Sequence, residues 1–325
     1  MPPRLLLYSG NSGSSGILVF LGFLFLLLGG CGRDNAAVVD FERVVRIQKP
    51  SPPAAGKPLL RIAVGAMISP QETFASYRNL LTYIGRKTGS ETELIQRKTY
   101  REVNELLGSG RIDVAFICSG PYVGGKEQHG FELLAVPQIR GACDYRAYLI
   151  VRNETFHGMG DLRGGVFAFT DPQSNTGRLV PAYWLKSQGE QPEKFFSRIV
   201  YTHSHNNSIH AVSRGLVDGA SVHSLIWEHY LRIDPSLAST IRVIRQSESY
   251  PIPPVVASSR LDKEVRERVT RVLLSMHEDP EGRRILEELE FDRFVDAPQE
   301  WFAKLARIEK ILSFLGEKGR AIEQP

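Results

Sequence analysis

Two groups of hydroxyl, amide and imidazole side chains stand where an apolar run gives way to a helical pattern. The first contains Ser174, Asn175 and Thr176, within the segment TDPQSNTG. A helix start offers unpaired backbone N–H groups and the positive end of the helix dipole, so an anion binds well there. The same residue types also form ordinary helix N-caps. On this segment alone, an anion site and a simple cap both stay open.

The second group is the segment SHNNS at 204–208, which precedes another helical pattern and contains His205. An imidazole N–H at this position is able to donate to an oxyanion. A lone histidine is also common as a surface or capping residue, so both interpretations stand. We interpret Asp218 as structural. Arg178, one turn into the first helix, is compatible with a contact to the anion, and an exposed, solvated side chain is the favoured interpretation.

The elements that must position these residues alternate between strands and helices. Residues 60–64 form a short apolar run, after which Phe74, Tyr77, Leu81 and Ile84 repeat at helical spacing as far as Gly89. Further strands are predicted at 92–96, 114–118, 133–137, 145–151, 166–170, 199–201, 219–222, 241–245 and 255–258, and helices at 103–107, 178–186, 208–214, 225–233, 263–276, 281–289 and 299–315. This alternation predicts an α/β fold with largely parallel sheets that carry helices on both faces.

A chain of 325 residues exceeds one ordinary core, which favours two lobes. We predict lobe 1 at 59–150, lobe 2 at 151–251, a return to lobe 1 with C-terminal helices at 252–315, and a tail at 316–325. Crossings near 148–152 and 250–256 would then form a hinge, with a ligand cleft between the lobes.

The first 31 residues predict export. Residues 17–28 read ILVFLGFLFLLL, the length of a signal-peptide core, with Arg4 before it. Leu28-Gly29-Gly30-Cys31 resembles the lipobox of bacterial lipoproteins, which implies lipidation of Cys31 and attachment to a membrane. The alternative is an uncleaved N-terminal anchor, and both place the remainder outside the cytoplasm, at the periplasmic or extracellular face. Gly32 leaves inner and outer membrane undecided, and the proline-rich segment 32–58 is predicted to be a flexible linker.

The composition excludes several classes of protein. The chain is 42% hydrophobic and 23% charged with a formal charge of +4, and its basic and acidic residues are interleaved. Without a basic, aromatic-laced stripe we expect no nucleic-acid partner. No metal-ligand spacing is present, so we expect neither a metal nor a cofactor. Cys118 and Cys143 each lie at the edge of a predicted strand, and a disulfide and two free thiols both remain open.

Four segments together resemble a known family. They read KTYREVNELLGSGRIDVAFICSGPY, DPQSNTGRLVPAYWL, SHNNSIHAVSRGLVDGA and YPIPPVV, and the resemblance spans roughly residues 60–315. The chain is similar to the phosphonate, phosphite and phosphate-type periplasmic substrate-binding proteins of ABC transporters. The resemblance implies a two-lobed, type II-like periplasmic-binding-protein fold. It also implies a monomer that delivers its ligand to an ABC permease and its ATPase.

The resemblance also implies roles for individual residues. Ser174, Asn175 and Thr176 would hold the phosphonyl oxygens, with an amide at the middle position where the family has a hydroxyl. The family's binding histidine matches His205, and its binding tyrosines match Tyr100, in KTYREV, and Tyr145, in CDYRAYLIV. Residue type alone would favour half-buried packing for both tyrosines.

One departure from the family bears on the ligand. The carboxylates with which some members hold an amino group fall on Leu225, with His223 nearby, and on Ile252. Neither position is acidic. The resemblance therefore implies an oxyanion with little or no amine tail, such as phosphate, phosphite or a small alkylphosphonate.

Two other functions are compatible with parts of the sequence. A hydrolase would use Ser174 as nucleophile and His205 as base, but the sequence contains no G-x-S-x-G segment and no evident residue to orient the histidine. We therefore predict that the chain is not an enzyme. A receptor that presents its ligand to a sensor kinase would keep the same fold, and the sequence leaves importer and sensor outputs open.

Overall fold

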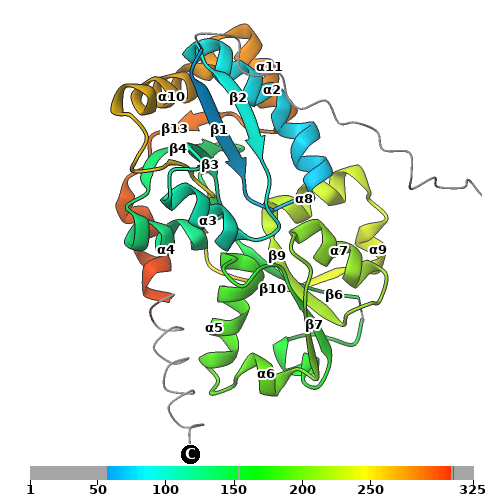
Figure 1. Cartoon of the computed structure of the whole chain (residues 1–325). Helices are drawn as coiled ribbons and strands as arrows, with labels where there is room; N and C mark the ends of the chain where they lie inside the picture. The colour runs from blue at the N-terminus through cyan, green and yellow to red at the C-terminus, as the bar shows by residue number, and fades with distance from the viewer. Residues whose placement is uncertain (1–56, 153, 309, 311–325) are drawn as a thin grey trace, which may run out of the picture. The chain divides into compact units, whose positions relative to one another are not determined.

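Two sheets organise the chain in a computed structural model that describes residues 57–152, 154–308 and 310 (Figure 1). The predicted signal peptide at 1–31, lipidated Cys31, the linker as far as residue 56 and the tail at 316–325 lie outside the described residues. No helix within the described ranges has the length and apolar character needed to cross a membrane.

Lobe 1 is built on a six-stranded sheet with the order β13-β4-β12-β3-β1-β2. Its strands are β1 (Leu59–Val64), β2 (Glu91–Ile95), β3 (Val114–Phe116), β4 (Glu132–Gln138), β12 (Val255–Ala257) and β13 (Arg293–Val295). β1 runs parallel to β2 and β3, whereas β12 runs antiparallel between β3 and β4. One face carries α2 (Pro70–Thr88), α10 (Lys263–Ser275), η3 (Met276–Glu278) and α11 (Pro280–Glu288), and the other carries α3 (Tyr100–Gly108) and α4 (Ser119–His129).

Helix α2 shows how the sequence specifies an element of lobe 1. It begins after Ser69, whose side chain forms a capping box with Glu72, and it ends at Gly89, whose φ of 73° suits a residue without a Cβ. Tyr77 and Ile84 of the predicted apolar stripe are buried against the sheet, whereas Phe74 faces solvent.

Lobe 2 is built on a five-stranded sheet with the order β10-β6-β9-β7-β8. Its strands are β6 (Ala147–Val151), β7 (Val166–Phe169), β8 (Arg198–Tyr201), β9 (Gly219–His223) and β10 (Arg242–Gln246). One face carries α7 (His205–Ser213), α8 (Ser224–Ile233) and α9 (Leu237–Thr240), and the other carries α5 (Val180–Lys186) and α6 (Pro192–Phe195). The short helices η1 (Met159–Leu162) and η2 (Asn175–Leu179) precede β7 and α5.

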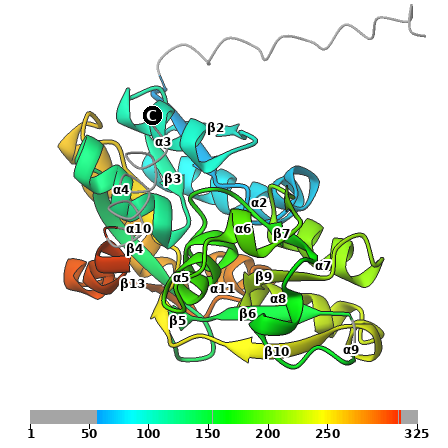
Figure 2. The ribbon, with the colours of Figure 1, turned by 90° about the horizontal axis from the view of Figure 1, so that it is seen from below.

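The sheets are mixed, which corrects the expectation that they would be largely parallel. The prediction holds for β1, β2 and β3 and for β7, β8 and β9, but β6 pairs antiparallel with β9, and β12 pairs antiparallel with β3 and β4. β13 also pairs antiparallel with β4. β6 and β12 arrive from the other lobe, so each enters its sheet in the opposite direction. Figure 2 shows β6 beside β10 in lobe 2.

A two-stranded sheet of β5 (Asp144–Tyr145) and β11 (Tyr250–Pro251) connects the lobes. The first crossing therefore lies before β6 and not near 148–152, because the whole of β6 already belongs to lobe 2. This moves the start of lobe 2 from residue 151 to about residue 147. The second crossing falls at β11, within the expected range of 250–256.

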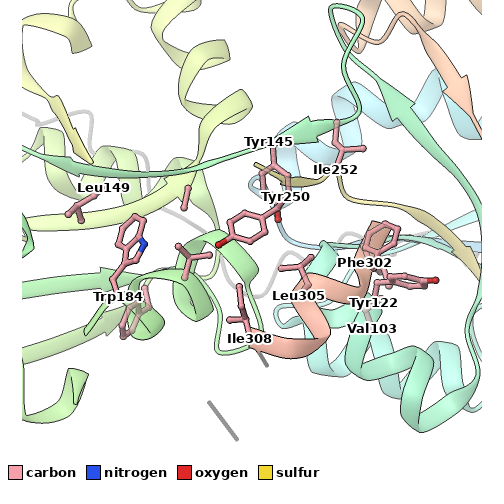
Figure 3. Close-up of a cluster of buried hydrophobic side chains, with 14 of the residues drawn as sticks. Val103, Tyr122, Tyr145, Leu149, Trp184, Tyr250, Ile252, Phe302, Leu305 and Ile308 are labelled. Atoms are coloured by element: carbon pink, nitrogen blue, oxygen red, sulfur yellow. The ribbon is translucent and has the colours of Figure 1, made fainter. Parts of the chain in front are cut away.

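The C-terminal segment packs against both lobes, next to the sheet of β5 and β11 that connects them. It contains η4 (Gln299–Phe302) and helical residues 303–308, and the expected helix at 299–315 continues into residues outside the described ranges. The rings of Phe302 and Tyr122 meet edge to face, with centroids 4.6 Å apart. Figure 3 shows Leu305 and Ile308 of this segment between Tyr122 of lobe 1 and Trp184 of lobe 2. One apolar cluster thus continues from lobe 1 into lobe 2.

Candidate functional site

Apart from Tyr145, the residues selected from the sequence follow the carboxyl ends of parallel strands in both sheets. In lobe 1, β2 leads to Tyr100, and in lobe 2, β7 leads to Ser174 and β8 leads to His205. The crevice beyond such strand ends is where open α/β sheets bind ligands. The lobes meet there, because the His205 N–H donates to the Met67 carbonyl at 2.9 Å and the Tyr100 N–H donates to Asp171 Oδ2 at 3.1 Å.

The SNTG segment combines a cap with unpaired polar groups. Ser174 Oγ accepts from the Gly177 N–H at 3.1 Å, so its cap role is present, and the helix opens with the π turn η2 before α5. Gly177 is required because a Cβ there would lie 1.8 Å from Thr170 Oγ1. Asn175 Oδ1 and Thr176 Oγ1 are buried without a hydrogen-bond partner among the described residues. The Thr176 hydroxyl is therefore available to a guest.

His205 is held as a neutral hydrogen-bond donor. It is the first residue of α7, and its Nδ1 accepts from the His223 N–H at 3.1 Å, which assigns the ring proton to Nε2. Burial lowers the pKa of His205 from 6.5 to about 3. Nε2 is buried and has no partner in the described part of the chain. His205 thus offers one N–H from an uncharged ring.

Tyr145 lies at the hinge and contacts lobe 2. Its Oη accepts from Asn175 Nδ2 at 2.9 Å, and its ring stacks on the His223 ring with centroids 4.0 Å apart. Cys118 Sγ lies 3.9 Å from the same hydroxyl. Burial raises the pKa of Tyr145 well above 10, so the hydroxyl stays protonated.

Tyr100 is the first residue of α3, after the N-cap Thr99. Its Oη lies beside Ser174 and forms no hydrogen bond with the described residues. Burial raises its pKa well above 10. Tyr100 and Tyr145 are each 2% exposed, so neither shows the half-buried packing that residue type alone favours.

Three further residues complete the cluster. Ser119 begins α4, a helix that the sequence did not predict because SGPYVGG contains weak helix formers. His223 ends β9, and burial, followed by the nearby His205, lowers its pKa well below 6.5. Asp171 follows β7 and accepts from Tyr100 and Gln173 N–H groups, while burial raises its pKa. Their common signal is a position at or shortly after the end of a buried strand.

The two helix starts selected from the sequence flank the same strand. Ser221 Oγ of β9 donates to the Thr176 carbonyl at 2.6 Å, and the His223 N–H of β9 donates to His205. Ser174 Oγ and His205 Nδ1 therefore both accept from backbone N–H groups. A hydrolase that used Ser174 as nucleophile and His205 as base would need these two atoms to be hydrogen-bonded to each other, whereas each is bonded to a backbone N–H group.

Three other expectations from the sequence concern Arg178, the cysteines and metal ligands. Arg178 is partly buried and not an exposed, solvated side chain, and its Nε has no partner in the described part of the chain. Cys118 and Cys143 are free thiols. The described ranges contain no group of three or more metal-ligating side chains.

The chemical character of the site follows from five buried polar atoms. They are Tyr100 Oη, Asn175 Oδ1, Thr176 Oγ1, His205 Nε2 and His223 Nδ1, all without a partner among the described residues. Buried polar atoms are normally paired, since an unpaired one costs about 1–3 kcal/mol. Asn175 Oδ1 can only accept, whereas the Tyr100 and Thr176 hydroxyls and the His205 Nε2–H can donate. These donors suit an anion with several oxygens.

Comparison with known proteins adds three kinds of likeness. The family model for the periplasmic substrate-binding protein of phosphonate ABC transporters matches residues 62–302. The phosphate-import protein PhnD of Mycolicibacterium smegmatis is 30% identical over 155 residues, which are 44% of this chain and 48% of that protein. A probable ABC transporter phosphite-binding protein of Prochlorococcus marinus is 24% identical over 48% of this chain and 54% of its own length. The matches therefore span about half the length of these curated relatives.

Solved structures show the same fold over a longer range. A binding-protein component of a phosphonate ABC transporter from Pseudomonas aeruginosa superposes with a TM-score of 0.71 and 19% identity, over 82% of this chain and all of that chain. The Prochlorococcus marinus PhnD1 complex with methylphosphonate also has a TM-score of 0.71, with 17% identity, 78% of this chain and 98% of that chain. These likenesses show the two-lobed periplasmic-binding-protein fold.

Proposed function

Because the chain belongs to the family of periplasmic substrate-binding proteins of phosphonate ABC transporters, we propose that it captures a small tetrahedral oxyanion and delivers it to an ABC permease and its ATPase. Phosphonate, phosphite and phosphate are the ligand class. Tyr100, Tyr145, Ser174, Asn175, Thr176 and His205 form the proposed binding site.

The observation that carries this proposal is the set of unpaired donors enclosed where the lobes meet. Tyr100 Oη comes from lobe 1, and Thr176 Oγ1 and His205 Nε2 come from lobe 2. An oxyanion removed from water must regain hydrogen bonds, and each charge-assisted bond contributes about 1.5–3 kcal/mol. The Ser174 and Tyr145 hydroxyls each accept one hydrogen bond and still have a proton to donate. Four or five such bonds, less the cost of binding, support about micromolar affinity or better.

Binding and closure would be coupled in this site. The Tyr100 backbone N–H donates across the cleft to Asp171, and its side chain lies beside Ser174. An anion held by both lobes would stabilise their contact, which is the hinge mechanism of two-lobed binding proteins. Each oxygen of Asp171 accepts from one backbone N–H group, which partly satisfies this carboxylate.

The location follows from the family and from the N-terminal sequence. The family is periplasmic. We further propose that lipidated Cys31 tethers the chain to a membrane, with 32–58 as the spacer, and that the protein acts as a monomer. Labelling with a fatty-acid analogue should be lost in Cys31→Ser, and retention of the label would rule out this anchor.

Calorimetric titration of the purified full chain with phosphate, phosphite and methylphosphonate tests the ligand class. At least one should bind with about micromolar affinity or better. Absence of heat and of any rise in melting temperature with all three would reject the class. Turnover of a phosphate ester that is lost in Ser174→Ala would favour a hydrolase instead.

A further inference from the structure

The side chain of Glu72 contacts both lobes at a place outside the proposed oxyanion site. Glu72 lies in the first turn of α2 in lobe 1, where its Oε2 accepts from the Ser69 hydroxyl at 2.8 Å and from the Ser69 N–H at 3.4 Å. The same Oε2 accepts from Asn206 Nδ2 of lobe 2 at 2.7 Å, and Oε1 accepts from the Tyr230 hydroxyl, also of lobe 2. Figure 1 shows the start of α2 beside α8, the helix that carries Tyr230. One carboxylate therefore joins α2 of lobe 1 to α7 and α8 of lobe 2.

The capping box of α2 does not account for the two contacts to lobe 2. The box uses only Oε2 of Glu72, whereas Oε1 accepts from Tyr230. Asn206 and Tyr230 are 4% and 5% exposed, so water has little access to their polar atoms. Burial and the bond to Glu72 raise the pKa of Tyr230 above its ordinary value of 10, so the hydroxyl keeps the proton that it donates. Bonds of this kind, from a neutral donor to a carboxylate, are stronger than bonds between two neutral groups.

The contact to Asn206 also positions the start of α7, which carries the proposed binding histidine. Asn206 follows His205 in the first turn of α7, and the His205 N–H donates to the Met67 carbonyl of lobe 1 at 2.9 Å. Two consecutive residues of lobe 2 therefore bond to lobe 1. The ring of His205 belongs to lobe 2 and the Tyr100 hydroxyl belongs to lobe 1, so the distance between these two donors depends on how α7 lies against lobe 1.

We propose that Glu72 is a positioning residue for oxyanion binding, because its carboxylate holds Asn206 and Tyr230 of lobe 2 against lobe 1 and thereby prolongs the closed state around the ligand. The proposal rests on the proposed function and adds to it a residue outside the binding site. Opening of the lobes breaks both bonds to lobe 2 but keeps the capping box, since Ser69 belongs to the same helix start. Loss of either bond should therefore favour the open state and accelerate the release of the ligand.

Tyr230→Phe tests this contact without disturbing the capping box. It removes one hydroxyl and keeps the ring, which packs into the core of lobe 2. Calorimetry on the full chain should show that the affinity for the tightest-binding of phosphate, phosphite and methylphosphonate falls about 10-fold. Stopped-flow tryptophan fluorescence should assign most of this loss to faster dissociation, because opening precedes release. A general loss of stability would leave the dissociation rate of the folded protein unchanged.

The matched control is Tyr83→Phe. Tyr83 lies on α2 and donates its hydroxyl to a carboxylate, Asp279 Oδ2, at 3.0 Å, but both residues belong to lobe 1. The two variants thus remove the same type of bond, one between the lobes and one within a lobe. Tyr83→Phe should leave the affinity and the dissociation rate unchanged. Equal losses of affinity in both variants would overturn the proposal.

A double-mutant cycle shows whether Glu72 and Tyr230 act through each other. Glu72→Gln keeps a capping-box residue at this position but removes the charge. It should weaken binding by about 10-fold or more, since it affects both partners in lobe 2. When Glu72→Gln and Tyr230→Phe are combined, the two losses should not add, because the residues share one bond. Full additivity would overturn the proposal.

The outcomes separate this inference from the proposed function. If the parent chain binds one of the three oxyanions and Tyr230→Phe binds and releases it as the parent does, the oxyanion function stands and the positioning role of Glu72 is wrong. If the parent chain binds none of the three, the oxyanion function fails and this proposal fails with it.

Discussion

The two lobes place different chemistry at the same architectural position. In lobe 2, the carboxyl ends of β7 and β8 lead into helix starts that carry Ser174, Thr176 and His205. In lobe 1, the end of β1 leads into Gly65, Met67 and Ile68, which line an apolar cavity of about 180 Å³ next to the proposed oxyanion site. Lobe 1 adds the Tyr100 hydroxyl but otherwise contributes mainly apolar wall. The comparison indicates that lobe 2 supplies most of the groups that recognise the charge, whereas the apolar wall is shared between lobe 1 and Leu225 and Ile226 of lobe 2.

The comparison is tested most directly by removing one hydroxyl from lobe 2. Thr176→Val keeps the shape of the side chain but deletes an unpaired buried oxygen. We expect the affinity for the oxyanion that binds the parent chain to fall by about 10- to 150-fold, since one charge-assisted bond is worth about 1.5–3 kcal/mol. Isothermal titration calorimetry measures the change.

Two controls accompany this substitution. Thr82→Val alters an exposed hydroxyl on α2 that donates to the Arg78 carbonyl, and it should leave affinity unchanged. Ile68→Ala trims the lobe 1 wall and should weaken methylphosphonate by less than about 3-fold, because so short a ligand leaves most of the cavity unfilled. If Ile68→Ala weakened methylphosphonate as much as Thr176→Val, the division between the lobes would be wrong.

A second prediction concerns the uncharged donor of lobe 2. Burial lowers the pKa of His205 from 6.5 to about 3. Between these two pH values, His205 therefore binds a proton in the unfolded chain but not in the folded chain. The contribution of His205 to stability is therefore complete above pH 6.5 and is lost as the pH falls toward 3. Between neutral pH and pH ~5 this loss amounts to about 2 kcal/mol.

Denaturant unfolding of the ligand-free chain and of His205→Gln, each followed against pH, isolates this effect. The stability of the parent chain relative to the variant should decrease by about 2 kcal/mol over that range. A constant difference between the two proteins would show that His205 titrates near its ordinary pKa and is not held as a neutral donor.

A third prediction tests whether both lobes must close on the guest. Gly120, at the start of α4, faces the SNTG loop so closely that a Cβ would lie 2.4 Å from the Gln173 carbonyl oxygen. Gly120→Ala suits the helix but obstructs the approach of the lobes. We expect affinity to fall on the order of 10-fold, since overpacking costs about 1–3 kcal/mol.

The matched control is Gly160→Ala, where a Cβ would meet nothing within 4 Å. Small-angle X-ray scattering should show that ligand compacts the control but compacts Gly120→Ala less. Full affinity and full compaction in Gly120→Ala would mean that this contact plays no part in closure.

The candidate site was predictable where its signal is local. A strand end followed by polar caps is contained in a few consecutive residues, and this signal identified Ser174 and His205. The tyrosines needed the family resemblance, because Tyr100 and Tyr145 carry no local signal beyond residue type. The role of His223 depends on β9 pairing between β6 and β7, which no short segment specifies.

The fold was predictable to the same extent. Alternating apolar patterns indicated most strands and helices, but the direction of β6 and β12 depends on which lobe each strand leaves and enters. The glycines and the proline in its sequence prevented the prediction of α4. This helix forms because Tyr122 packs into the core. The walls of the apolar cavity come from distant parts of the chain. From the sequence, Leu225 and Ile252 were therefore recognised only as positions where some family members have a carboxylate, and the cavity was not predicted.

The smallest expected effect concerns the charged rim, where the lobes also meet. Arg140 of lobe 1 pairs with Glu228 of lobe 2 at 2.8 Å, and their side chains are 54% and 31% exposed. Exposed pairs contribute about 0.2–1 kcal/mol and are screened by salt. Arg140→Gln should therefore weaken binding by no more than about 5-fold at low salt and have almost no effect at high salt. A salt-independent loss as large as that of Thr176→Val would mean that closure depends on the rim, and the strand ends would no longer account for recognition by themselves.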